Sequence, residues 1–98
     1  MSRQALRFTE AAIVEAESAA GWYGERNLQA REDFLQELRK AFELIEEAPE
    51  RWPKHLHGTR RIVLDRFPFS VIYRVLPEAP QVLAVAHDKR RPGYWRHR

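Results

Sequence analysis

The sequence predicts an α+β fold, in the order β-α-α-β-β-β, with an antiparallel sheet covered on one face by a helical hairpin. Two segments before residue 48 carry apolar residues at helical spacing. The stretch from Arg60 to His87, in contrast, is dense in β-branched and aromatic residues. Short gaps that contain proline divide this stretch into three runs, and gaps so short permit antiparallel neighbours but no parallel crossover. We expect the 98 residues to form one domain, 1–98.

The chain begins with a predicted strand over residues 4–8 and a predicted helix over residues 10–23. Thr9 precedes the helix, where its hydroxyl can accept a hydrogen bond from a free backbone N–H. The apolar stripe of this helix is mostly alanine, which lets another element approach closely. Its members are Ala12, Ile13, Ala16, Ala20 and Tyr23.

A turn is predicted over residues 24–27, with Asn27 as the cap of a second helix, Leu28–Glu47. This helix has a continuous apolar stripe, which needs the sheet to bury it. The stripe consists of Leu28, Phe34, Leu35, Leu38, Ala41, Phe42 and Ile45. Pro49 and Pro53 stop the helix, and residues 50–58 are expected to form a loop anchored by Trp52.

The three later strands are predicted over residues 60–66, 69–76 and 81–87. The middle run is apolar on both faces, which is typical of a central strand covered twice. We expect the helical hairpin to cover one face, because no other element is available to cover either. The second face should then expose an apolar patch, and such a patch marks a binding site.

Composition excludes several classes of site. The chain has no cysteine, so disulfides, thiolate metal sites and cysteine nucleophiles are absent. His55 and His57 lie two residues apart with no third ligand in view, so we expect no metal and no cofactor. No apolar segment resembles a signal peptide or a membrane anchor, and a cytoplasmic location is expected.

Charge is divided unevenly along the chain. Residues 1–50 contain six Lys/Arg and eleven Asp/Glu, whereas residues 51–98 contain eleven Lys/Arg and three Asp/Glu. A basic half of this kind favours an acidic partner, either nucleic acid or an acidic protein segment. The alternative is a solvated surface on which the charges are mixed in space.

The C-terminal segment 88–98 concentrates the basic charge beside two aromatic residues. It holds five Lys/Arg and one acid, with Tyr94 and Trp95 between them. Arginine and aromatic side chains are enriched in interface hot spots, and the same mixture suits nucleic acid. In the alternative interpretation Tyr94 and Trp95 pin the C-terminus onto the sheet while the arginines stay in water. Both hold together if Trp95 is packed and Arg90, Arg91 and Arg96 point outward.

Four segments carry a resemblance to a known family. They are residues 58–61 (GTRR), 66–74 (RFPFSVIYR), 82–87 (VLAVAH) and 90–95 (RRPGYW). Together with the order of elements, they resemble the RelE/ParE superfamily of toxins from type II toxin–antitoxin systems. The match is to the ParE-like branch, often labelled plasmid-stabilisation proteins, and it covers nearly the whole chain.

The resemblance implies a small bacterial toxin that is neutralised by a cognate antitoxin in a hetero-oligomer. Characterised ParE-type members inhibit DNA gyrase without being nucleases, so gyrase is the expected target. The residues expected to bind the target are Lys89, Arg90, Arg91, Tyr94, Trp95 and Arg96. Those expected to bind the antitoxin are Arg60, Arg61, Ile72 and Arg74.

Two alternatives stay open. The first is a RelE-like, ribosome-dependent mRNA endoribonuclease, which needs a base, an acid and cations for the phosphate. Its candidate residues are Arg60, Arg61, His87, Arg90 and Tyr94. The lysine cluster of RelE-type nucleases has no clear counterpart here, and His87 alone is more readily interpreted as a structural histidine. The second alternative is an inactive, toxin-like interaction module.

Overall fold

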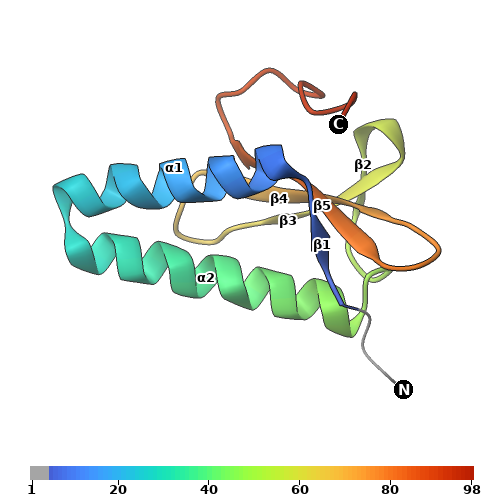
Figure 1. Ribbon diagram of the computed structural model, residues 1–98, viewed down its shortest axis with the longest axis horizontal. Coiled ribbons are helices and arrows are strands. Elements are labelled where there is room, and N and C mark those ends of the chain that lie inside the picture. The colour runs from blue at the N-terminus through green and yellow to red at the C-terminus, as the bar shows by residue number, and fades with distance from the viewer. Residues whose placement is uncertain (1–4) are drawn as a thin grey trace.

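The computed structural model describes residues 5–98, in which two helices pack on one face of a five-stranded sheet (Figure 1). The elements are β1 (Arg7–Phe8), α1 (Glu10–Arg26), α2 (Leu28–Glu47), β2 (Lys54–His55), β3 (Thr59–Val63), β4 (Phe69–Val75) and β5 (Pro80–His87). The strand order across the sheet is β1-β5-β4-β3-β2. The predicted α+β class and the helical hairpin are confirmed.

The sheet is mixed rather than wholly antiparallel. β3, β4 and β5 form the predicted antiparallel meander, but β1 pairs with β5 in parallel, with Phe8 opposite Val82. The first predicted strand began at Gln4, which lies outside the described residues. Thr9 ties the start of α1 to the same edge, since its backbone N–H donates to the Val82 carbonyl and its hydroxyl donates to the Leu83 carbonyl.

The loop prediction for residues 50–58 was wrong in part, because this segment contributes β2. Lys54 pairs with Arg60 and His55 with Thr59, and a single 3-10 turn, Leu56–Gly58, closes the hairpin. The turn requires a left-handed backbone at two consecutive positions, His57 at φ 57° and Gly58 at φ 73°. A strand of two residues has no alternation to detect, so the sequence pattern missed it.

The two helices are separated by one residue, not by the predicted turn over residues 24–27. α1 continues to Arg26, and Asn27 serves both helices. Its backbone N–H donates to the Tyr23 carbonyl, and its side-chain oxygen accepts from Gln29 N and Ala30 N. Two caps on one residue allow this tight connection, so the low helix propensity of Gly24 does not end α1 early.

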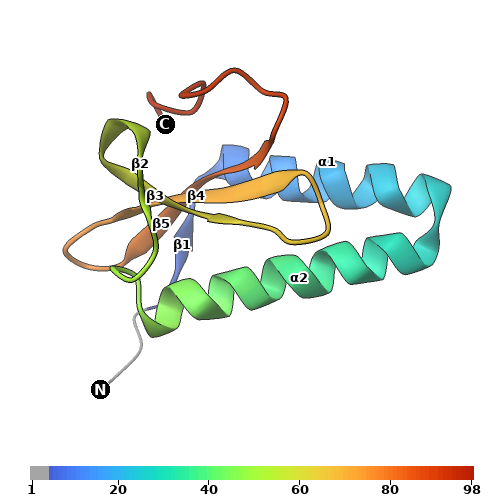
Figure 2. The ribbon, with the colours of Figure 1, turned by 180° about the vertical axis from the view of Figure 1, so that it is seen from behind.

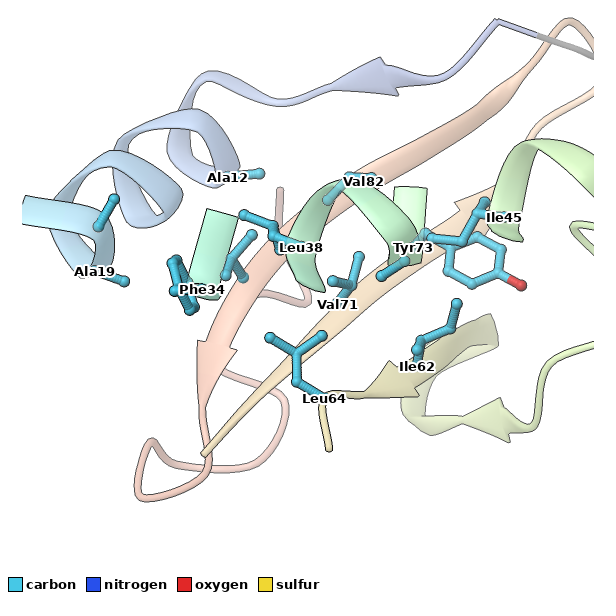
Figure 3. Packing of buried hydrophobic residues seen from close by; sticks show 13 residues of the cluster. Ala12, Ala19, Phe34, Leu38, Ile45, Ile62, Leu64, Val71, Tyr73 and Val82 are labelled. Atoms are coloured by element: carbon cyan, nitrogen blue, oxygen red, sulfur yellow. The ribbon is translucent and has the colours of Figure 1, made fainter. Parts of the chain in front are cut away.

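The core between the hairpin and the sheet follows the predicted stripe of α2. Figure 3 shows Phe34, Leu38 and Ile45 of α2 against Val71 of β4 and Leu64, the residue that follows β3. Aromatic rings pack together at one end of this core. The centre of the Phe34 ring lies 5.3 Å from those of Tyr23 and Phe69 and 5.4 Å from that of Phe67. Two predicted stripe members are exposed instead: Ile13, and Leu28, which is 74% exposed at the start of α2.

Most residues of β5 are buried, and their side chains contribute to the cores on both faces of the sheet. A register shift between Ile72 and Tyr73 of β4 inserts Leu83 as an extra residue on β5. Such a bulge sends two consecutive side chains to one face. Leu83 and Ala84 both face away from the helices, where they belong to a second buried cluster.

Candidate functional site

The C-terminal segment 88–98, called the tail below, covers the sheet face that the helices leave free. Figures 1 and 2 show it leaving β5, crossing that side of the sheet and ending beside β2. Trp95 is 2% exposed and packs with Ile72, Leu83, Ala84 and Ala86. The prediction of an open apolar face was therefore wrong. The tail supplies the second cover, because a single indole is large enough to fill the small-residue surface of β5.

Glycine at position 93 lets the tail approach the 3-10 turn. Its φ is +78°, and a Cβ there would lie 3.0 Å from His57 Nε2. The rings of His55 and His57 lie 5.8 and 6.0 Å from the Trp95 ring. Trp95 is therefore held between the strand face and the β2 hairpin.

Glu15 of α1 fixes the end of the tail. Its carboxylate accepts from the Tyr94 hydroxyl at 2.6 Å and from the Arg98 guanidinium at 2.8 and 3.1 Å. It also accepts from the backbone N–H of Val85 at 3.1 Å, on the part of β5 that β1 does not pair. The Glu15 side chain is 16% exposed and that of Arg98 is 23% exposed. We call this arrangement the Glu15 clamp.

The clamp also sets the protonation of its partners. Burial, together with the hydrogen bond to Glu15, raises the pKa of Tyr94. The hydrogen bond to Glu15 raises the pKa of Arg98. Tyr94 therefore holds its proton and donates it toward Glu15 throughout the neutral range.

The residues predicted to bind a target divide into anchors and exposed cations. Trp95 is buried and Tyr94 is partly buried, whereas Lys89, Arg90, Arg91 and Arg96 are exposed. Arg90 lies with its guanidinium carbon 3.9 Å from the centre of the Tyr94 ring and its nearest nitrogen 4.0 Å from Glu15. The positions of these side chains confirm that Trp95 packs while Arg90, Arg91 and Arg96 face solvent.

The residues predicted to bind an antitoxin are not all at the surface. Ile72 is 2% exposed beneath Trp95, so its side chain is closed to a partner while the tail is in place. Arg60 donates to the Trp52 carbonyl at 2.8 Å, a contact that fastens the loop after α2. Arg61, on the opposite face of β3 as alternation required, is exposed, and Arg74 is partly exposed.

Four of the five nuclease candidates converge on one small pocket of about 130 Å³, which we call the tail pocket. Arg61, His87, Arg90 and Tyr94 line it, and Arg60 does not. His87 Nδ1 accepts the Lys89 backbone N–H at 3.0 Å, and its ring meets Phe69 edge-on. Those contacts match the structural interpretation of His87, and the Tyr94 hydroxyl is engaged by Glu15.

A larger groove of about 520 Å³, missed by the sequence reasoning, runs between α1 and the ends of β4 and β5. Val14, Ser18 and Trp22 form its helical wall at a spacing of four residues, and Phe69 and His87 lie on the sheet side. Val14 and Trp22 are each 52% exposed. The sequence did contain a signal for this groove, because large apolar residues occur on the side of α1 opposite the alanine stripe. Glu15 and Arg90 close one end, so the groove shares them with the clamp.

Residues 5–98 contain no cluster of three or more His, Cys, Asp or Glu side chains suited to a metal ion. The His55 ring lies against Trp95 of the tail, and burial together with the positive charge of Arg61 lowers the pKa of His55. Among the described helices, none is long and apolar enough to cross a membrane.

Comparison with known proteins places this geometry in a family. The family described as "ParE toxin of type II toxin-antitoxin system, parDE" matches residues 6–92. A solved chain from the chromosomal ParDE toxin–antitoxin system of P. aeruginosa superposes with a TM-score of 0.70 and 22% identity, covering 87% of this chain and 96% of that chain. At that identity the likeness shows a shared fold. No curated protein matches the chain significantly in sequence. Since the family match extends over far more than half of its length, the chain belongs to the ParE toxin family of type II toxin–antitoxin systems.

Proposed function

We propose that this protein is a toxin that arrests bacterial growth by binding DNA gyrase, in the cytoplasm, and that a cognate antitoxin holds it inactive. The observation that carries the proposal is the tail, in which buried Trp95 fixes a row of outward cations. An anchored cationic segment binds an acidic surface with less loss of conformational entropy than a free tail would. ParE-type toxins characterised so far act on gyrase by binding, which matches a surface of this kind.

The antitoxin surface that fits best is the groove beside α1. An amphipathic helix can place its apolar side chains against Val14 and Trp22. Arg26 lies 3.7 Å over the Trp22 ring at one end and Arg90 lies at the other, so acidic residues on the incoming helix would meet a cation at each end. Arg61 and Arg74 remain candidates for a second contact on the sheet face.

A partner in this groove would also lie against Glu15. Because Glu15 holds Tyr94 and Arg98, groove binding and the position of the tail are joined through one side chain. An antitoxin bound in the groove could therefore neutralise the toxin without covering the cations of the tail.

Growth arrest tests the tail. Deleting residues 94–98 is a poor test, because it removes a core residue together with the cations. The sharper variant converts Lys89, Arg91 and Arg96 to glutamine, which leaves Trp95 and the Glu15 clamp in place. The matched control converts three exposed cations elsewhere, Arg39, Lys40 and Arg51. Induced without antitoxin, the tail variant should lose toxicity and the control should keep it; equal toxicity of both would overturn the tail assignment.

The antitoxin surface is tested with the cognate antitoxin, to be sought first as a short acidic reading frame beside this one. Trp22→Ala should weaken the complex about thirtyfold, because truncating an aromatic hot-spot residue costs about 2 kcal/mol. The control is Leu28→Ala, an apolar residue outside the groove that is 74% exposed, against 52% for Trp22. If both variants bind alike, the groove is not the antitoxin site.

The second candidate function is a ribosome-dependent endoribonuclease, and the observation that favours it is the convergence of Arg61, His87, Arg90 and Tyr94 on the tail pocket. The engagement of Tyr94 by Glu15 speaks against it, since the phenol is then unavailable as an acid or base. Reading mRNA integrity and DNA supercoiling in the same induced cells separates the two functions. Unchanged growth together with a tight partner would indicate an inactive interaction module.

A further inference from the structure

The tail pocket has the size and lining of a site for one small anionic group. It holds about 130 Å³, whereas pockets for whole drug-sized ligands span roughly 300–1,000 Å³. Buried Trp95 and Ile72 close its base, and Arg61 of β3 and Arg91 of the tail stand on its rim. Two segments distant in sequence thus bring guanidinium groups to one concavity.

Two of the three arginines that line the pocket, Arg61 and Arg91, are not neutralised by their neighbours. Within residues 5–98, Arg61 and Arg91 form no ion pair with a carboxylate. Arg90 also lines the pocket, and Asp88 is the one carboxylate in the lining. Because Arg90 is paired with Glu15, two unpaired arginines face one aspartate. Burial first, and then the positive charges of Arg61 and His57, lower the pKa of His55, which lines the same pocket.

The donors available suit a phosphate group. Guanidinium forks match phosphate oxygens with two parallel hydrogen bonds. Ser70 lines the pocket, and its hydroxyl has no hydrogen-bond partner among the described residues. The hydroxyl is not sealed from solvent, because the described residues include no buried side-chain oxygen or nitrogen without a partner. The hydroxyl is thus free to donate.

We propose that the tail pocket binds one phosphate of a nucleic-acid backbone. The pocket is too small for a nucleoside, and Trp95 is too deeply buried to stack on a base, so the contact would be independent of sequence. Lys54 of β2 and Arg96 of the tail are exposed, and the tail ends beside β2 (Figure 1), which extends the positive surface beyond a single group. A polyanion uses that extension, and a single phosphate ion does not. The site shares Arg91 with the proposed gyrase surface and its pocket with the endoribonuclease candidate, but binding of a phosphate there requires neither gyrase inhibition nor cleavage.

Two binding experiments on the purified full chain test the proposal. Inorganic phosphate, added to labelled protein and followed by NMR, should shift the Ser70 amide and the Trp95 indole N–H. A fluorescent single-stranded oligonucleotide, followed by anisotropy, should bind more tightly than phosphate and displace it. The double variant Arg61→Gln/Arg91→Gln should bind the oligonucleotide about tenfold more weakly and lower its salt slope by about 0.7, the value for one phosphate contact on a single strand.

The control is Arg39→Gln/Lys40→Gln, which removes the same charge from the exposed face of α2. It should change oligonucleotide affinity less than twofold. Equal losses in both double variants would show that only net charge matters and would overturn the proposal. Phosphate shifts without oligonucleotide binding would overturn the nucleic-acid source, as would tighter binding of an acidic peptide at the same residues. Arg91→Gln alone, which alters no buried side chain, repeats the test if the double variant misfolds.

Discussion

The Glu15 clamp makes the sharpest prediction about stability. Glu15→Gln keeps the shape of the side chain but removes its charge and one acceptor oxygen. Hydrogen bonds to a charged group are each worth about 1.5–3 kcal/mol, and Glu15 has such bonds to Tyr94 and Arg98. Loss of the charge also leaves the partly buried Arg98 unpaired. Allowing for the partial exposure of both groups, we expect a loss of about 2–3 kcal/mol in the free energy of unfolding.

The assay combines urea unfolding with amide hydrogen exchange of the tail. The matched control is Glu17→Gln, an exposed glutamate on the same helix, which should change stability by less than about 0.5 kcal/mol. In Glu15→Gln the Arg96 and Arg98 amides, which donate within the tail, should exchange faster while core amides stay protected. A Glu15→Gln protein that unfolds like the control, with tail exchange unchanged, would refute the clamp.

Three further substitutions follow from single contacts. Trp95→Ala should cost about 3–5 kcal/mol in a denaturant titration, because it empties the second core; a loss under about 1 kcal/mol would mean that the tail is not packed. Asn27→Ala should cost about 1 kcal/mol by thermal melting, since it removes the cap of α2, and an unchanged melt would contradict the two capping bonds. Burial raises the pKa of Tyr73 to about 12 from 10.0, so the unfolded chain loses this proton first and stability should fall as pH rises from 10 to 12. In Tyr73→Phe the fall should be shallower, with Tyr94 still contributing in the same direction; an identical slope would exclude Tyr73 as a source.

The elements that could be predicted are those whose side chains repeat. The α2 stripe names its own core positions, because Phe34, Leu38 and Ile45 recur at helical spacing and all three are buried. The alternation in β3 likewise separated Arg60 from Arg61 correctly. What failed were features without a period: β2 has two residues, and the pairing of β1 with β5 depends on where the chain returns in space.

The candidate site was harder, because it joins segments far apart in sequence. The tail composition indicated an anchor with outward cations, but not that Trp95 would close the second sheet face. Nothing in the sequence distinguishes Glu15 from the other glutamates of its helix, and only the fold brings it to Arg98, 83 residues later. The groove escaped notice for the same reason, since Trp22 and Phe69 line one wall each.

We propose that the anchored tail presents cations that inhibit gyrase. A supercoiling assay with purified gyrase, relaxed plasmid and this protein tests it most directly. We expect inhibition by the native chain, loss of inhibition when Lys89, Arg91 and Arg96 become glutamine, and full inhibition by the variant of Arg39, Lys40 and Arg51. Undiminished supercoiling at every concentration of the native, folded protein would contradict it.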